Sequence, residues 1–296
     1  MTPLAGLTVA VVGPGAIGGT VAAWLSRSPL VRDLTLCVRT PLDRLVVDTP
    51  TGVIEAAPRV VTQPAAITAP VDWVLIATKT YDVAAAATWL APLVGPDTRV
   101  AVLQNGVEHV ARFSPFVDPA NILPVVVDLP AERSAPGRIA HRRAGTMTVP
   151  AGEAGSAFVA LFDDSIIQVS TTDDFLSACW TKLALNCAGA VCALTGRPAG
   201  VVAAPGMAEL MRGMVRECVA VGRGQGASLD DDLPDVVVER TRASPPDSVN
   251  SLLADRLAGR RMEWDARNGV IVRIGAAHGL DAPLNRMAAT LLGALE

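Results

Sequence analysis

The first hundred residues alternate short apolar runs with alanine-rich segments of helical length. β-Branched apolar runs predict strands, and the segments between them predict helices. In chain order these are the strand LTVAVV (7–12), the helix AIGGTVAAWLSRS (16–28), the strands DLTLCVR (33–39) and DWVLIAT (72–78), the helix DVAAAATWLAPL (82–93) and the strand TRVAVLQ (98–104). Strands joined by right-handed helical crossovers predict an α/β domain with a doubly wound parallel sheet.

The pattern changes after residue 120. Pro and Gly separate the short runs NILPVVVDLP (121–130), GRIAHRR (137–143) and GTMTVP (145–150), which predicts strands that pair as hairpins and extend the sheet. From Asp173 the pattern is helical, with polar breaks at 228–234 and 243–248. A chain of 296 residues suits two domains, and we expect a sheet domain over 1–170 and a helical domain over 171–296.

Composition narrows the class of protein. Half of the residues are apolar and 18% are charged, so the chain has ample material for two cores. A net charge of −4 with scattered arginines excludes a nucleic-acid footprint. The apolar run Leu4–Leu25 has no preceding basic residue and is interrupted by glycines and a proline, which favours neither a signal peptide nor a membrane partner.

The cysteines and histidines point away from metal and disulfide chemistry. Five cysteines form no Cys-x-x-Cys pair, and the three histidines stand far apart in the sequence. We therefore expect reduced core thiols, a cytoplasmic location and no metal site.

A glycine-rich loop follows the first predicted strand. Gly13, Gly15 and Gly18 have G-x-G-x-x-G spacing and open the first predicted helix. The first glycine makes the turn, the second lets backbone N–H groups approach a pyrophosphate, and the third lets helix and strand pack closely. This context favours a dinucleotide site, including Ala16 and Ile17, over a simple glycine-rich turn.

Three further side chains end predicted strands of this domain. An acidic residue after the second strand is usual for NAD, whereas Arg39 stands there and can pair with the 2′-phosphate of NADPH. Lys79 and Asn105 follow later strands, at the edge where doubly wound sheets bind ligands. An exposed strand-end arginine, a solvated lysine and an Asn-Gly turn are the alternatives.

The segment WTKLALNCAGAVCALTG (180–196) contains a single charge, on Lys182. Lys182 and Asn186 are four residues apart and share one helix face, which small residues continue at Gly189, Ala190 and Ala193. A lysine that reaches solvent from the start of a helix is the alternative. A ketone reductase needs a proton donor for the developing alkoxide, and a desolvated lysine can supply that proton.

Two later segments offer partners for this lysine. RRMEWDARNG (260–269) contains Glu263 and Asp265, although spacing alone favours a solvated face with Arg260, Arg261 and Arg267. SVNSLLAD (248–255) contains Ser248 and Ser251, for which helix capping is the alternative.

Nine motifs in order resemble the ketopantoate reductase (2-dehydropantoate 2-reductase) family. They are GPGAIGG, CVR, ATKTYDV, LQNGVE, PGRIAH, WTKLALN, SVNSLLAD, RRMEWDARNG and AHGLDAPLN. The resemblance implies a Rossmann-type domain followed by a helical domain of the 6-phosphogluconate dehydrogenase type. It also implies NADPH-dependent reduction of 2-dehydropantoate to pantoate.

The resemblance assigns roles residue by residue. Lys182 is similar to the general acid and Glu263 to the acid that contacts the substrate hydroxyl. Asn186 and Ser251 are similar to substrate ligands, Ser251 for the carboxylate, with Ser248 nearby. Asn105 and Lys79 are similar to groups on the cofactor and substrate side, and Arg39 to the 2′-phosphate ligand. Where the family often has a second asparagine, this chain has Ala190.

Two other functions fit the same residues. One is reduction of a different 2-oxo acid, because substrate choice rests on other contacts than hydride transfer. The other is a noncatalytic NADPH-binding sensor. Against it stands the joint presence of Lys182, Asn186, Ser251 and Glu263, for which a sensor has no chemical need. The apolar composition is also compatible with a homodimer.

Overall fold

The computed structural model describes residues 6–296, so residues 1–5, including Leu4 of the first apolar run, lie outside the described residues. The chain divides into two compact units. The first comprises Met1–Gln104 and Glu108–Phe175, and the second comprises Asn105–Val107 and Leu176–Glu296. A short loop around Gly106 therefore belongs to the second unit although its neighbours in sequence belong to the first.

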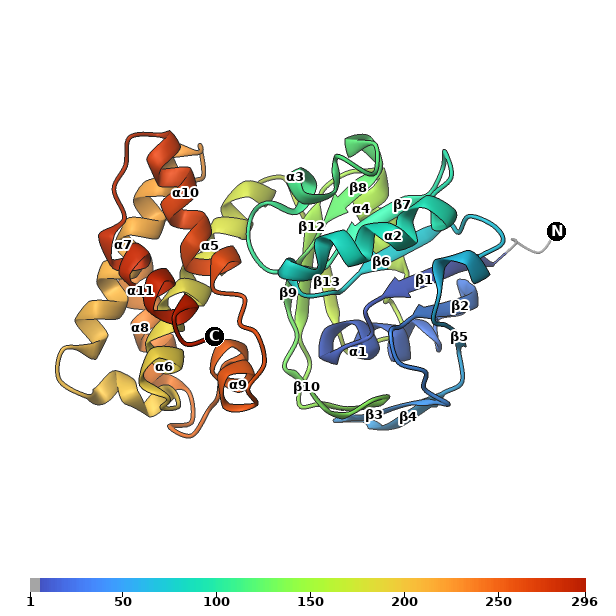
Figure 1. Cartoon of the computed structure of the whole chain (residues 1–296), viewed down its shortest axis with the longest axis horizontal. Coiled ribbons are helices and arrows are strands. Elements are labelled where there is room, and N and C mark those ends of the chain that lie inside the picture. The colour runs from blue at the N-terminus through green and yellow to red at the C-terminus, as the bar shows by residue number, and fades with distance from the viewer. Residues whose placement is uncertain (1–5) are drawn as a thin grey trace. The chain divides into compact units, whose positions relative to one another are not determined.

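The first unit is built on a six-stranded sheet whose strands all pair in parallel (Figure 1). In spatial order the strands are β5 (Arg59–Val61), β2 (Val31–Cys37), β1 (Leu7–Val12), β6 (Trp73–Ile76), β7 (Arg99–Val102) and β8 (Ile122–Pro124). The order reverses between β1 and β6, which is the point where doubly wound sheets bind dinucleotides. The predicted doubly wound parallel sheet is confirmed.

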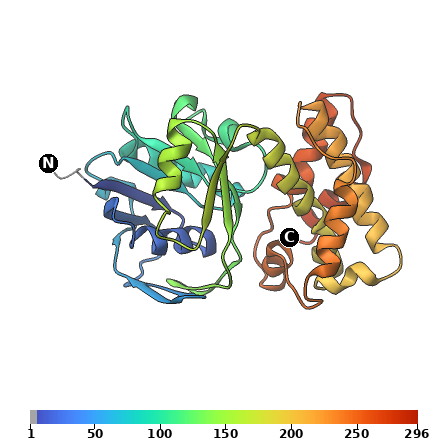
Figure 2. The same ribbon diagram turned by 180° about the vertical axis from the view of Figure 1, so that it is seen from behind.

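Helices cover both faces of this sheet, because its strands carry apolar side chains on both faces. Val9 and Val11 pack with α1 (Ala16–Leu25) and α4 (Glu153–Ala160). Residues such as Val74 pack instead with α2 (Val83–Leu93) and α3 (His109–Phe113). Figure 1 shows α2 in front of the sheet, and the reverse view brings the yellow-green helix α4 forward (Figure 2). Apolar runs rather than alternating ones are expected of such a sheet.

The prediction that the later strands extend this sheet is wrong except for β8. The other strands form two small sheets. One contains β10 (Ala131–Ala135), β11 (Arg138–His141), β3 (Leu45–Thr49) and β4 (Gly52–Ala56), and the other contains β13 (Gln168–Thr172), β12 (Thr146–Pro150) and β9 (Val126–Asp128). Ile139 on β11 packs so closely on Gly19 of α1 that a Cβ there would lie 2.1 Å from its Cδ1. A hairpin pattern predicts local pairing and does not predict which layer the hairpin joins.

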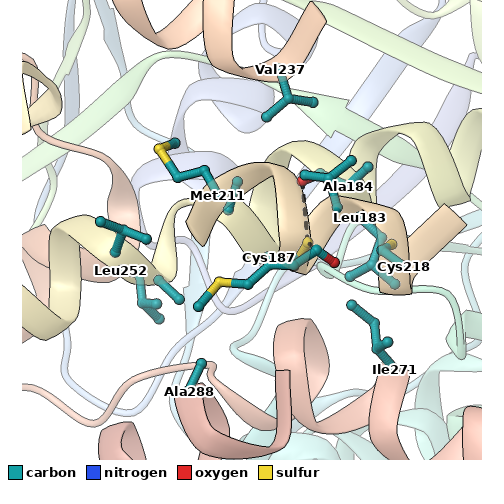
Figure 3. Packing of buried hydrophobic residues seen from close by; sticks show 14 of the residues in the cluster. Leu183, Ala184, Cys187, Met211, Cys218, Val237, Leu252, Ile271 and Ala288 are labelled. Carbon is teal, nitrogen blue, oxygen red and sulfur yellow. Dashed lines mark hydrogen bonds between the residues drawn. The ribbon is translucent and has the colours of Figure 1, made fainter. Parts of the chain in front are cut away.

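The second unit is helical throughout its described regular elements, as predicted (Figure 2). Its helices are α5 (Phe175–Ala188), α6 (Ala190–Thr195), η4 (Ala199–Ala203), α7 (Met207–Gly224), α8 (Leu233–Ala243), α9 (Ser251–Leu257), the π-helix η5 (Asp265–Gly269), α10 (Val270–Ala277) and α11 (Pro283–Gly293). Figure 3 shows side chains from most of these helices converging on Cys187 of α5. The lysine helix is therefore the centre of this core.

The segment Phe175–Thr195 is long and apolar enough to span a membrane, with 21 residues and a mean hydropathy of 1.3. Half of its apolar window is buried within the protein. Core helices of soluble proteins meet the same criterion, and Leu183, Ala184 and Cys187 of this segment pack in the helical core.

The helix that carries Lys182 breaks at Gly189. α5 ends at Ala188 and α6 begins at Ala190. Two asparagines satisfy carbonyl groups at the break: Asn268 donates from Nδ2 to the oxygen of Cys187 (3.1 Å), and Asn250 donates from Nδ2 to the oxygen of Gly189 (3.0 Å). A Cβ at position 189 would lie 3.0 Å from that Asn250 nitrogen. The glycine thus permits the close approach that satisfies the backbone.

The predicted stripe of small residues along this helix is wrong beyond Asn186. The break turns Ala190 and Ala193 into the core, where both are fully buried. They pack against neighbouring helices and leave no space for a ligand beside them.

A buried amide network continues from Asn268 into the rest of the helical unit. Asn268 donates to Oδ1 of Asn285 (2.9 Å), and Asn285 donates to the oxygen of Met214 (3.0 Å) and to Glu217 Oε2 (2.8 Å). The Glu217 carboxylate also accepts from the backbone nitrogens of Leu284 and Asn285 in the first turn of α11. The network joins α7, η5 and α11, and it leaves these buried donors satisfied.

Replacing Asn285 with leucine keeps the branching of the side chain and removes these hydrogen bonds. We expect Asn285→Leu to lower the free energy of unfolding by about 2–4 kcal/mol, because buried polar partners lose their bonds. Urea denaturation followed by tryptophan fluorescence measures the change. The control is Asn121→Ala, which removes one exposed bond to the oxygen of Pro96 and should change stability by less than about 0.5 kcal/mol. Equal losses for the two variants would contradict the role of the network.

Candidate active site

The three glycines of the loop after β1 have three different surroundings. Gly13 has a φ of +81°, and a Cβ there would lie 2.6 Å from Thr78 Cγ2. A Cβ on Gly18 would lie 2.6 Å from the oxygen of Gly13, whereas one on Gly15 would meet nothing within 4 Å. The first glycine therefore serves the turn and the third the packing of α1, while the second leaves the backbone open to approach. This is the division of roles expected of a pyrophosphate-binding loop.

The N-terminus of α1 supplies donors next to this loop. Gly15 is the N-cap and the nitrogen of Gly19 closes the first turn on its oxygen (2.9 Å). The N–H groups of Ala16, Ile17 and Gly18 precede that first bond, so they have no helical acceptor. No acidic side chain lies in this turn. The donors and the helix dipole fit a phosphate group.

Arg39 lies two residues after β2 with 83% of its side chain exposed. Its Nη2 is 3.6 Å from Asp82 Oδ2. The guanidinium is free to turn toward a 2′-phosphate, and the same exposure fits a strand-end arginine without a ligand. Asp82 contributes a competing negative charge beside it.

Gln104, which the sequence did not single out, bridges the loops after β6 and β7. Its Nε2 donates to Thr78 Oγ1 (3.1 Å) and to the oxygen of Lys79 (3.3 Å). Its Oε1 is buried and has no hydrogen-bond partner in the described part of the chain. Lys79 is half-buried in the first unit, whereas Asn105, predicted at the same edge, belongs to the second unit.

Asn105 joins the lysine helix to Glu263. Asn186 Nδ2 donates to Asn105 Oδ1 (3.4 Å), and Asn105 Nδ2 donates to Glu263 Oε2 (3.1 Å). Lys182, half-buried, lies one turn before Asn186 on α5. Glu263 is 3% exposed, so its carboxylate depends on such donors for solvation. Three predicted site residues from distant parts of the sequence thus form one hydrogen-bonded chain.

Of the two acids before α10, the buried one faces this cluster. Asp265 is exposed and forms an ion pair with Arg273 on α10, whereas Glu263 is buried. The alternative of a solvated face fits Arg260 and Arg261, which are exposed, but it is wrong for Arg267, which is 2% exposed.

Arg267 is buried within the π-helix. The backbone nitrogens of Asn268 and Gly269 both bind the oxygen of Trp264 (2.9 and 3.1 Å), and this wider turn buries four successive residues, 266–269. Arg267 Nη2 donates to Ser251 Oγ (2.8 Å). Burial lowers the pKa of Arg267, while the nearby Glu263 and Asp255 carboxylates act to raise it. Side-chain periodicity of an α-helix does not predict this placement.

Ser248 and Ser251 occupy different positions relative to helix α9. α9 begins at Ser251, and its N-cap is Asn250, whose Oδ1 accepts from the nitrogen of Leu253 (2.9 Å). The capping alternative is therefore wrong for Ser251. Ser248 lies in the preceding turn, where its carbonyl accepts from Ala199 (2.9 Å). Within residues 6–296 its hydroxyl makes no hydrogen bond, so the structure does not connect Ser248 to the cluster.

The described residues contain no group of three or more His, Cys, Asp or Glu side chains placed to hold a metal ion. All five cysteines are buried, and none of them forms a disulfide.

Comparisons with known proteins agree over the whole chain. Residues 9–154 match the family described as Ketopantoate reductase PanE/ApbA, and residues 174–296 match its C-terminal family. The chain is 58% identical to the 2-dehydropantoate 2-reductase of Caulobacter vibrioides, over 97% of this chain and 98% of that one. It is 40% identical to that of Mycobacterium tuberculosis, over 97% of each.

A solved 2-dehydropantoate 2-reductase from Geobacter metallireducens has the same fold, with a TM-score of 0.91 at 28% identity over 98% of this chain and 100% of that one. The resemblance carried by the nine motifs is confirmed, and the chain belongs to the ketopantoate reductase family.

Proposed function

We propose that this protein reduces 2-dehydropantoate to (R)-pantoate with NADPH. The observation that carries the proposal is the hydrogen-bonded chain from Asn186 through Asn105 to the buried Glu263. These groups, with Lys182 one turn before Asn186 on α5, are of the types that reduction of a ketone requires. The high identity to 2-dehydropantoate 2-reductases supports the same activity.

We assign cofactor binding to residues 1–170 and substrate binding and catalysis to 171–296, together with Asn105. The N–H groups of Ala16, Ile17 and Gly18, which have no helical acceptor, would hold the pyrophosphate. Gly13 would make the turn, and Gly15 would leave the backbone open to approach. Arg39 would bind the 2′-phosphate, with Lys79 and Asn105 toward the nicotinamide. When bound, the nicotinamide supplies the hydride to the carbonyl carbon.

Lys182 serves as the general acid. As the carbonyl carbon gains a hydride, its oxygen gains negative charge and takes a proton from the ammonium. The chain has 25 basic residues besides histidine, and only two, Lys79 and Lys182, are lysines. Arginine holds its proton at any physiological pH, whereas a lysine can release one. The rare residue type stands where the reaction needs a proton donor.

The neighbours of Lys182 orient the substrate. Glu263, held by Asn105, accepts from the substrate hydroxyl, and Asn186 donates to the substrate. Ser251 binds the carboxylate. Ser248 stays a prediction from its place in sequence.

The buried position of Ala190 bears on the alternative substrates. A different 2-oxo acid was suggested by the loss of an amide there, but Ala190 is 0% exposed and packs in the core. A residue at this position packs in the core, so alanine in place of asparagine there does not argue against 2-dehydropantoate as the substrate. A cytoplasmic location and a homodimer remain predictions from composition.

Replacing Lys182 tests the acid. We expect Lys182→Ala to lower kcat at least about 100-fold, because a positioned general acid contributes about 10²–10⁴-fold. The NADPH dissociation constant should stay unchanged, since the variant leaves the glycine loop intact. NADPH oxidation with 2-dehydropantoate and fluorescence titration of NADPH give the two quantities.

The matched variant Lys182→Arg separates charge from proton donation. It keeps the positive charge and holds its proton, so kcat should fall nearly as far as in Lys182→Ala while KM changes less. Full activity of Lys182→Arg would contradict the role of Lys182 as the acid. If the unaltered protein reduces none of a panel of 2-oxo acids, the result favours the noncatalytic NADPH sensor.

Arg39 governs the choice of cofactor. We expect Arg39→Asp to weaken NADPH binding about 10- to 100-fold, because a charged pair to the phosphate is lost, and NADH binding much less. The control is Asp82→Asn, which removes the competing carboxylate 3.6 Å away and should tighten NADPH modestly. Titration of each variant with both cofactors measures this, and an equal loss for NADPH and NADH would refute the assignment.

A further inference from the structure

Arg267 is a buried cation beside the substrate-binding serine, and the proposed mechanism does not use it. Its side chain is 2% exposed, and its Nη2 donates to Ser251 Oγ at 2.8 Å. Its Nε is buried without a hydrogen-bond partner in residues 6–296. A buried guanidinium with an unsatisfied donor is costly, so its retention calls for a reason beyond packing.

We propose that Arg267 is a positioning residue that acts through Ser251 and makes the site specific for substrates that carry a carboxylate. The inference rests on the proposed function, in which Ser251 binds the carboxylate of 2-dehydropantoate. It adds to that function the group that sets the direction of the serine hydroxyl.

The direction follows from hydrogen-bond chemistry. A guanidinium donates and never accepts, and a hydroxyl has one proton and two lone pairs. Because Arg267 occupies a lone pair of Ser251 Oγ, the hydroxyl proton is left for an acceptor on its other side. Ser251 itself is exposed, so a ligand can reach it. Donation from a cation also polarises the hydroxyl and strengthens its bond to an anion.

Arg267 also affects the electrostatic environment of an anionic substrate. Glu263 and Asp255 are 3% and 5% exposed, and both interact electrostatically with Arg267. An anionic substrate near two buried carboxylates is repelled. The Arg267 cation offsets that repulsion, so a carboxylate substrate benefits from it and a neutral ketone does not.

The test uses the full-length enzyme with Arg267→Met, Ser251→Ala and the double variant. Steady-state kinetics are measured with 2-dehydropantoate and with its methyl ester as a neutral probe. We expect each single variant to raise KM for the acid at least about tenfold, the size of one charge-assisted hydrogen bond, with kcat within about threefold. The double variant should resemble the single ones, and KM for the ester should hardly change.

A matched control comes from the same segment. Arg260 is exposed and binds Asp255 Oδ1 (2.9 Å). Arg260→Met therefore removes a cation from Asp255 without altering Ser251, and KM for the acid should rise much less than in Arg267→Met. An increase in KM equal to that of Arg267→Met would overturn the proposal.

Other results would also overturn it. If Arg267→Met raises KM by the same factor in the Ser251→Ala background, Arg267 does not act through Ser251. If KM rises equally for acid and ester, the carboxylate is not involved. If Arg267→Met fails to fold, Arg267→Lys replaces it, because it keeps the charge near Glu263 and Asp255 and loses the reach to Ser251. An unchanged KM in Arg267→Lys would then refute the inference.

Failure of the proposed function gives a different result. In that case the unaltered enzyme oxidises no NADPH with 2-dehydropantoate. If the unaltered enzyme turns over 2-dehydropantoate and the Arg267 variants have the same KM as it has, the role of Arg267 is refuted and the proposed function is not.

Discussion

The site depends on the two side-chain amides that bind the broken lysine helix. Asn268 and Asn250 donate to the carbonyl oxygens of Cys187 and Gly189. The Gly189 oxygen also accepts a long bond from the nitrogen of Ala193 (3.5 Å). Each asparagine belongs to a segment that carries site residues. Asn268 lies in the π-helix with Arg267, and Asn250 is the cap directly before Ser251. The break therefore fixes both segments against α5, the helix of Lys182, through satisfied backbone groups rather than through packing alone.

Hydrogen bonds also satisfy the buried charged side chains of the helical unit. Glu263, Asp255 and Arg267 are all nearly inaccessible to solvent, and each has hydrogen bonds to neighbouring polar groups. Burying charges stabilises a fold poorly, so this cluster is better explained by function. Desolvated groups interact strongly with a reacting centre because water does not screen them. The hydrogen bond from Asn268 to Asn285 links the π-helix, which carries Arg267, to α11.

The sequence predicts those features that depend on local chemistry. The parallel sheet follows from apolar runs, the dinucleotide loop from Gly13, Gly15 and Gly18, and the helical second unit from its periodicity. The sheets that β10, β11, β12 and β13 join could not be predicted, because hairpin signals do not specify which sheet a strand joins. The fold of the lysine segment beyond Asn186 was missed for a related reason: Gly189 permits a break, and only the distant Asn250 and Asn268 make the break favourable.

Arg267 shows the limit of prediction at the site itself. Near Arg260 and Arg261 its charge suggests a solvated face, and no local pattern in the sequence indicates a π-turn. The π-turn at Trp264 lies where residues 266–269 are buried, and such turns are frequent at functional sites. The cofactor loop binds through backbone groups, whose geometry glycine spacing reveals. A substrate site built from side chains on separate helices has no comparable local signature, and its residues become recognisable only when burial and hydrogen bonding are seen together.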